Sequence, residues 1–452
     1  MSTQASLRQR VPSPSPAAGQ VEKDQLLREA EDAEVTEGQR FIVPNFTVKQ
    51  LLDAIPAHCF HRSAIHSSLY VVQDFVLLGA LVYGAYNIDP FLAKYNLSPV
   101  AFQAARIALN SLYVFAAGLV GTGVWVIAHE CGHQGYSSSK TINNTVGWFL
   151  HSALLVPYHS WRISHGRHHA ATGHLTRDEV FVPVTRKDRG VPEMKEEGEI
   201  LGLNVTEERQ SELAELLEDA PLAVLFNLFI RQLVGWPAYL AVNASGQKHY
   251  PNWTNHFTPS SIIFKASHFW QIIWSDIGVV LTLAALSFWT YKRGFSEVLV
   301  TYILPYLFVN NWLVFITYLQ HTDPALPHYS ANQWTFARGA LATVDRTFMG
   351  PIGGYILHGI CETHVAHHIS SKIPHYNAWE ATEALKKFLG PHYQRSEENM
   401  FVSCYKSYRD CVYVEDNQDI VFYKNARGVA QKVAVDENGN ISDSGVDMTE
   451  SK

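Results

Sequence analysis

The sequence predicts an all-α, polytopic integral membrane protein with about four transmembrane helices in two hairpins. Apolar residues occur in long runs that carry almost no charge, whereas both ends and one inner loop are polar. An apolar run of about 20 residues can cross a bilayer as a helix. The 452 residues are therefore expected to form a disordered tail over residues 1–45, one membrane domain over residues 46–424 and a second disordered tail over residues 425–452.

The first hairpin is expected over residues 69–128. Its first helix, residues 69–88, contains Asp74, and the part without charge is shorter than the roughly 20 residues that a span needs. Asp74 must therefore lie near an interface or face protein. The second helix, residues 107–128, is long enough alone and continues directly into His129.

The second hairpin is expected over residues 269–319, as helices at 269–291 and 298–319 with a short connection. Between the hairpins, residues 141–157 are apolar but too short to span comfortably, so an interfacial or re-entrant position is expected. Residues 221–244 contain Arg231 and Pro237, which favours a helix on the membrane surface or partly inserted.

Three groups of histidines follow membrane segments. The first lies in His-Glu-Cys-Gly-His, and the other two have the spacing His-x-x-His-His. Residues three and four positions apart share one face of a helix, so each group directs two or three imidazoles the same way. Eight imidazoles exceed the needs of one ion and suit a pair of metals. They are His129, His133, His165, His168, His169, His364, His367 and His368.

These groups can share one site only if an even number of crossings separates each pair, which two hairpins provide. The loop over residues 162–195 is rich in Arg and Lys, so this side is expected to be cytosolic. Both termini then face the cytosol. Uncleaved spans, no transit peptide and cytosolic chemistry point to the endoplasmic reticulum membrane.

Composition argues against two other classes of protein. The net charge of −7 is not typical of a chain that binds nucleic acid, so no such partner is expected. The five cysteines are scattered and odd in number, which disfavours a disulfide framework.

His129-Glu130-x-x-His133 alone also matches the zinc-protease motif, with Glu130 as general base. A catalytic zinc needs only three protein ligands, and zinc cannot change its oxidation state. Eight imidazoles favour two redox-active ions, and iron is the better expectation.

The three motifs, in this order around two hairpins, resemble those of the membrane fatty-acid desaturases. The similarity is greatest to the fungal and plant delta-12 (oleate) and omega-3 acyl-lipid desaturases, through stretches such as Thr-Arg-Asp-Glu-Val-Phe-Val-Pro at residues 176–183 and Pro-His-Tyr-Asn-Ala-Trp-Glu at residues 374–380. It covers residues 46–424. The resemblance implies a centre of two Fe²⁺ ions that uses O₂ and two electrons to convert an oleoyl lipid, such as a phospholipid, to a linoleoyl lipid. It also implies cytochrome b5 and its NADH-dependent reductase as electron donors.

The resemblance assigns the eight histidines as metal ligands and adds His321, at the end of the last span. Metal-bound imidazoles need hydrogen-bond acceptors behind them, and four acidic residues are candidates. These are Glu130, Asp178, Glu179 and Glu362. Glu362 stands where the family usually has aspartate. Trp148, Trp312 and Tyr376 are candidates for lining the acyl tunnel, and the alternative for each is a place among the aromatic residues at the membrane interface.

The sequence leaves several functions open. An omega-3 or bifunctional desaturase, a hydroxylase, an epoxygenase and an acetylenase would all share these histidines. A membrane zinc protease and a lipid sensor without enzymatic activity are more distant alternatives. The acyl carrier, phospholipid or coenzyme A, and the oligomeric state are also open.

Overall fold

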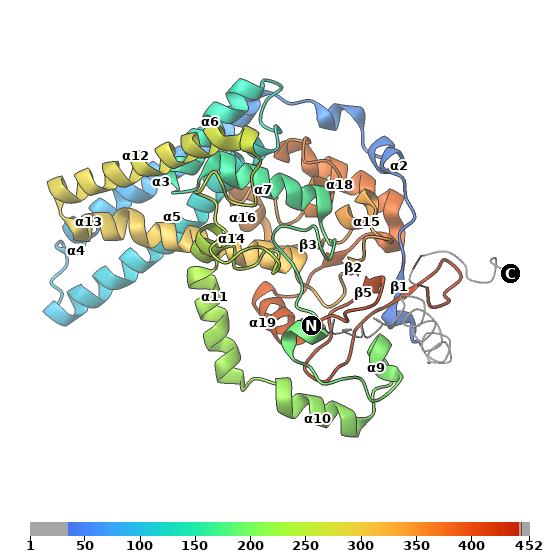
Figure 1. Ribbon diagram of the computed structural model, residues 1–452. Coiled ribbons are helices and arrows are strands. Elements are labelled where there is room, and N and C mark those ends of the chain that lie inside the picture. Colours follow the sequence, from blue (N-terminus) through green and yellow to red (C-terminus); the bar gives the residue numbers. More distant parts are fainter. Residues whose placement is uncertain (1–34, 443, 445–452) are drawn as a thin grey trace, which may run out of the picture.

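The computed structural model describes residues 35–442 and residue 444, and it is mostly helical. Long helices form a bundle, and shorter helices with three small sheets form a cap at one end of it (Figure 1). The predicted all-α membrane architecture is confirmed.

The bundle contains the two predicted hairpins. The first consists of α3 (Ala64–Tyr86) and α5 (Pro99–Gly132), with the short α4 (Ile88–Leu92) between them. The second consists of α12 (Phe269–Arg293) and a continuous helical segment formed by α13 (Phe295–Val298), the π-helical turn η4 (Leu299–Ile303) and α14 (Leu304–His321). Each hairpin partner is long and apolar enough to cross a membrane.

Helix α5 is the centre of the bundle. At 1.5 Å per residue, its 34 residues extend about 51 Å, well beyond a hydrocarbon core of about 30 Å. Its middle packs closely on α14, because a Cβ on Gly118 would lie 2.3 Å from Phe308 Cβ. The surplus length carries the first histidines out of the bundle and into the cap.

Asp74 faces protein, which was one of its two predicted positions. Its side chain is fully buried, and its Oδ2 lies 2.9 Å from Nε2 of His358. The small residue Gly123 of α5 makes room for this pair, since a Cβ there would lie 2.3 Å from the carbonyl oxygen of Ile356. The acidic side chain in the first span, Asp74, therefore has a hydrogen-bond partner inside the protein.

Helix α11 (Pro221–Val242) is also long and apolar enough to cross a membrane, so five helices within residues 35–442 meet this criterion where about four spans were predicted. Figure 1 shows α11 running across the direction of the bundle helices. Its outward side chains, such as Leu222 and Phe226, are exposed and apolar. This arrangement agrees with the predicted helix at the membrane surface, and it keeps the number of crossings between the histidine groups even.

The cap surrounds the end of α5. It contains α6 (Lys140–Ala153), which lies in the segment 141–157 predicted as interfacial or re-entrant, and α7 (Tyr158–Ala171), which follows it. Among the described residues, its other α-helices are α2 (Val48–Asp53), α8 (Arg186–Arg189), α9 (Gly198–Leu201), α10 (Glu207–Leu217), α15 (Phe336–Ala340), α16 (Gly350–Ile356), α17 (His364–Ile369), α18 (His375–Leu389) and α19 (Met400–Asp410).

Three two-stranded sheets hold the cap together. In the first, β1 (Arg40–Ile42) and β6 (Val433–Val435) are parallel, with Phe41 opposite Ala434. The second pairs β2 (His328–Tyr329) with β5 (Ile420–Val421) in antiparallel orientation, and the third pairs β3 (Asp345–Arg346) with β4 (Arg395–Ser396) in parallel.

The β1–β6 pair corrects the predicted boundaries of the tails. Residues 35–45 and 425–442, expected to be disordered, contain strands and buried side chains such as Val43 and Val435. Each strand is three residues long and is stabilised by the other, so neither carries a local signal. The rest of both predicted tails lies outside the described residues, apart from Ser444.

Candidate metal centre

Four helices bring their histidines to one place. The last turn of α5 carries His129, α7 carries the second group, α14 ends at His321, and α17 carries the third group. Asp345 supports the start of α17 by accepting a hydrogen bond from the Val365 N–H at 2.8 Å. The three groups predicted to meet therefore do meet, on one side of the bundle.

Five of these imidazoles form a first group. Their ligand atoms all lie within 4.8 Å of one another. Within it, Nε2 of His129 lies 3.1 Å from Nε2 of His133, and the same distance separates Nε2 of His165 from Nε2 of His169. His367, from α17, completes the group.

The remaining imidazoles form a second group beside the first. His168, His321 and His368 have ligand atoms within 4.8 Å of one another. Nε2 of His321 lies 3.3 Å from that of His168 and 2.9 Å from that of His364. The rings of His169 and His368 stack at 4.1 Å, so the two groups adjoin.

This arrangement fits a pair of metal ions. Two imidazole nitrogens at about 2.1 Å from one ion and at right angles to it would be about 3 Å apart, which is the spacing of the Nε2 pairs. Nε2 of His367 and Nε2 of His368 are buried without a hydrogen-bond partner among the described residues. Buried polar atoms normally have a partner, so these lone pairs are available for a ligand bond.

Two side chains orient the imidazoles from behind. Nδ1 of His168 donates a 2.7 Å hydrogen bond to Oδ1 of Asp178, and this carboxylate also accepts bonds from the N–H groups of Gly173 and Val180. Thr172 donates its hydroxyl proton to the His168 carbonyl oxygen and therefore accepts at 3.1 Å from Nδ1 of His368. Both contacts leave Nε2 with its lone pair free. Asp178 was predicted and Thr172 was not.

The other three predicted acidic residues differ from Asp178. Oε1 of Glu130 lies 3.5 Å from Nδ1 of His129 and 3.7 Å from Nδ1 of His367, close to both but beyond hydrogen-bond length. Glu179 instead accepts from Arg167 and Tyr250.

Glu362 accepts from the Phe348 N–H at 3.1 Å. Neither Glu179 nor Glu362 has a hydrogen bond or ion pair to any of the nine histidines in the described structure, so the orienting role predicted for them is not what their contacts show.

Burial favours the neutral form of His165, His169 and His367. It lowers the pKa of His367 to about 3, and it holds the pKa of His165 and His169 well below the ordinary value, with their neighbouring histidines adding to the shift. Burial alone would raise the pKa of Asp178, but the charge and hydrogen bond of His168 and two backbone N–H groups more than offset this and lower it. Neutral imidazoles and an ionised carboxylate are the forms that bind and orient a metal.

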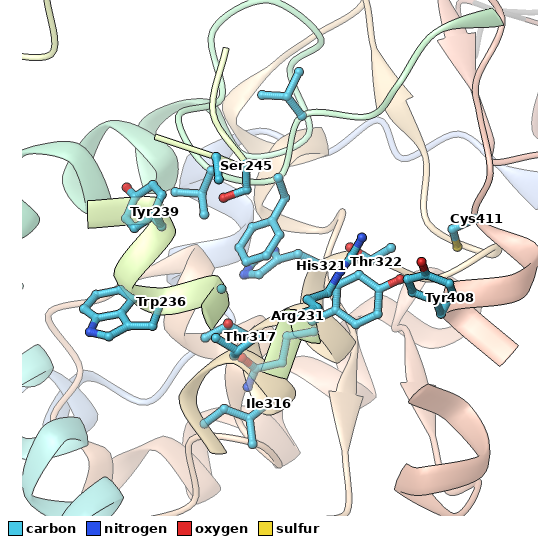
Figure 2. Close-up of a pocket in the computed structure, with 18 of the residues that line it drawn as sticks. Arg231, Trp236, Tyr239, Ser245, Ile316, Thr317, His321, Thr322, Tyr408 and Cys411 are labelled. Carbon is cyan, nitrogen blue, oxygen red and sulfur yellow. The ribbon is translucent and has the colours of Figure 1, made fainter. Parts of the chain in front are cut away.

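A cavity of about 470 Å³ reaches the histidines and is lined mainly by apolar side chains. Its lining includes Trp236 and Tyr239 of α11 and Ile316 of α14 (Figure 2), and also Leu313 of α14. The cavity wall includes five of the nine histidines, His129, His165, His168, His321 and His364. Volume and lining are those of a site for a flexible apolar molecule.

The predicted tunnel residues lie elsewhere. Trp148 donates to the Trp274 carbonyl oxygen, and Trp312 is packed inside the core against Phe115 and Phe348. Tyr376 lines a separate cavity of about 620 Å³. In the described structure none of the three lines the cavity that reaches the histidines.

Comparison with known proteins assigns the chain to a family. The sequence profile of the fatty acid desaturases matches residues 107–397, more than half of the chain and the whole stretch that carries the nine histidines. The chain belongs to the fatty acid desaturase family. Its oxidoreductase class and its membrane character follow, and its two histidine groups can hold metal.

Several relatives of this desaturase are similar over most of their length. A Delta(12) fatty acid desaturase from Mortierella alpina is 48% identical over 389 residues, which cover 85% of this chain and 92% of the relative. The Delta(12)-fatty-acid desaturase of Arabidopsis thaliana is 40% identical over 387 residues, covering 84% and 92%. An oleate hydroxylase from Claviceps purpurea is 40% identical over 423 residues, covering 88% and 84%.

The zinc-protease alternative is disfavoured by the same observations. A catalytic zinc site uses three protein ligands and keeps one open position. Here His129 and His133 belong to a group of five imidazoles, and Glu130 lies behind the histidines in the protein interior.

Proposed function

We propose that this desaturase inserts the delta-12 double bond into an oleoyl lipid to give a linoleoyl lipid. O₂, two electrons and two protons combine with the two hydrogens removed from the acyl chain to form two molecules of water. The observation that carries the proposal is a cavity of about 470 Å³, lined mainly by apolar side chains, that ends on five of the nine histidines. The naming of the Mortierella and Arabidopsis relatives supports the position of the double bond.

The proposed cofactor is a pair of iron ions. His129, His133, His165, His169 and His367 would hold one ion, and His168, His321, His364 and His368 would hold the other. When bound, the iron pair would supply the activation of O₂ needed to remove hydrogen from an unactivated methylene. Asp178 and Thr172 hold the imidazoles of His168 and His368 with Nε2 directed inward.

The protein would choose the reacting carbons by position. All methylenes in the middle of an acyl chain are chemically alike, so only the placement of one pair against the centre can discriminate among them. Trp236, Leu313 and Ile316 are the side chains suited to fix that placement, since they line the cavity together with the histidines. The same wall keeps water away from the acyl chain.

The electrons would come from cytochrome b5 and its NADH-dependent reductase. The proposed site is the endoplasmic reticulum membrane, with the histidines and both termini on the cytosolic side. The basic residues of the loop over residues 162–195 support that orientation.

A hydroxylase is the second candidate, because the Claviceps relative is named an oleate hydroxylase. Omega-3, bifunctional, epoxygenase and acetylenase variants would use the same histidines. Expression of the chain in a yeast that lacks polyunsaturated lipids, followed by analysis of fatty-acid methyl esters, separates these outcomes. The proposal predicts a new 9,12-diene; a hydroxylated product alone would assign the second candidate, and an unchanged profile would favour the lipid sensor.

A further inference from the structure

The wall of the cavity contains a charged side chain to which the reaction assigns no part. Arg231 lies in α11, and it is the one charged residue among the 22 residues of that helix. Figure 2 shows it beside Tyr408 and Thr317, on the same helix as Trp236 and in the same cavity as His321.

Two aromatic rings flank the guanidinium. Its Cζ lies 4.8 Å from the ring centre of Tyr318 and 5.1 Å from that of Tyr408. Rings over the faces of a planar guanidinium leave its N–H groups directed outward along its edges. Within residues 35–442, no side chain or carbonyl group forms a hydrogen bond or an ion pair with Arg231.

Two other cations in the same wall are paired. Lys248 lies 3.1 Å from Asp188, and Arg409 lies 2.9 Å from Asp410. Within residues 35–442, Arg231 differs from Lys248 and Arg409 in having five donors and no acceptor, and Arg189 in the same wall also has no ion pair.

The surroundings of Arg231 make an anion favourable there. The outward side chains of α11 are apolar and exposed, including Phe229 at 62% and Leu233 at 38%. Such a surface faces lipid, where a cation without a counter-ion is costly. A substrate with an apolar chain and an anionic group would satisfy the cavity and the guanidinium together.

We propose that Arg231 binds the phosphate group of the acyl carrier and thereby positions the acyl chain in the cavity. This inference rests on the proposed function, because it takes the occupant of the cavity to be an acyl substrate. Guanidinium and phosphate form two parallel N–H···O bonds, a match that neither a lysine nor a neutral side chain provides. A phosphate is present in both a phospholipid and an acyl-coenzyme A, but not in a diacylglycerol.

Binding of defined carriers to the full chain in detergent tests the proposal. Dissociation constants are measured for dioleoyl phosphatidylcholine, oleoyl-coenzyme A and the phosphate-free dioleoylglycerol. The wild type is expected to bind at least one phosphate-bearing carrier more tightly than dioleoylglycerol, and Arg231→Gln should weaken that binding roughly tenfold to a hundredfold while leaving dioleoylglycerol unchanged. If Arg231→Gln weakens the binding of phosphatidylcholine only, the acyl carrier is a phospholipid. If it weakens the binding of oleoyl-coenzyme A only, the carrier is the coenzyme A thioester.

Two further variants keep the test decisive. Lys187→Gln removes an exposed charge of α8, outside the cavity wall, and should change no dissociation constant. Arg231→Lys keeps the charge, so it should fold and retain part of the preference for phosphate. Equal carrier preferences in the wild type and in either Arg231 variant would overturn the inference.

Failure of the inference and failure of the proposed function are distinguishable. If the wild-type chain produces a 9,12-diene in yeast but the Arg231 variants keep the wild-type carrier preference, only the role of Arg231 is wrong. If the wild type leaves the fatty-acid profile unchanged, the proposed function is wrong, and the inference that rests on it falls as well.

Discussion

His168 and Asp178 form a buried hydrogen bond of 2.7 Å between Nδ1 and Oδ1, and Nε2 of the same imidazole points into the second histidine group. The carboxylate fixes the tautomer and the ring orientation of His168. Such a hydrogen bond raises the basicity of the imidazole and fixes its orientation, so it binds a metal ion more strongly than a free imidazole does.

Asp178→Asn is therefore expected to lower metal retention or desaturase activity by roughly 10- to 100-fold. The amide is similar in shape but removes the charge that favours the N–H donor of His168. Metal content of the purified protein and diene yield in yeast are the measurements. Glu179→Gln is the matched control, since Glu179 contacts Arg167 and Tyr250, and an equal loss in both variants would contradict the assignment.

Trp236→Ala is expected to alter which products form rather than whether the centre assembles. Removing a large side chain from the cavity wall gives the acyl chain new positions, so double-bond position or chain-length preference should shift at unchanged metal content. Trp148→Ala serves as control, because Trp148 lies outside this wall. Gas chromatography of methyl esters reports the result, and a shift with Trp148→Ala but not with Trp236→Ala would reverse the cavity assignment.

Gly123→Ala is expected to destabilise the bundle by about 1–3 kcal/mol. The new Cβ would lie 2.3 Å from the Ile356 carbonyl oxygen, so α5 and the segment that carries His358 must separate. Gly84→Ala, in α3, is the control. A Cβ at Gly84 would have no heavy atom within 4 Å, so this variant should leave the melting temperature in detergent nearly unchanged. Equal melting temperatures of the two variants would show that the close approach is not needed.

Much of this site could be predicted from the sequence because histidine spacing is a local signal. Two or three imidazoles on one helical face are visible as His-x-x-His-His, and the even number of crossings brings the groups together. Asp178 could be proposed because it closely follows the second group. Thr172 could not be proposed in this way. Its hydroxyl accepts a hydrogen bond from His368, almost two hundred residues away, and no local sequence pattern indicates such a contact.

The features that could not be predicted from the sequence have a physical explanation as well. Aromatic residues are frequent throughout membrane segments, so residue type alone does not distinguish a side chain that lines a cavity from one that packs in the core. The sequence therefore did not single out Trp236, which lines the cavity, and did single out Trp312, which packs against Phe348. The strand pair of Phe41 and Ala434 joins segments nearly four hundred residues apart. Such short strands exist only because each pairs with the other.

A buried ion-pair network in the cap predicts a dependence on pH. Glu199 is fully buried and pairs with Arg209 at 2.9 Å and with Arg186 at 3.1 Å. Burial alone would raise its pKa, but these arginines and a backbone N–H of Lys195 outweigh burial and lower it.

A lowered folded-state pKa means that the contribution of Glu199 to stability is complete above the ordinary glutamate pKa and is lost as pH falls through the lower folded value. Glu199→Gln should cost about 1.5–3 kcal/mol near neutral pH, because it removes the carboxylate that both arginines share and leaves Arg186 with Glu415 and Arg209 with Glu212. Melting temperatures measured from pH 7 to pH 3 check this. The exposed Glu215 provides a control as Glu215→Gln, and a loss from Glu199→Gln no larger than the control's would contradict the role of the network.

We propose that nine histidines from four helices hold two iron ions. The decisive measurement is metal analysis of the full chain, purified without chelators and quantified against protein concentration. We expect about two irons per chain in the wild type and fewer in His168→Ala and His367→Ala, each of which removes one ligand of a different group. A single zinc per chain, or an iron content that neither substitution changes, would show that these histidines do not hold a pair of irons.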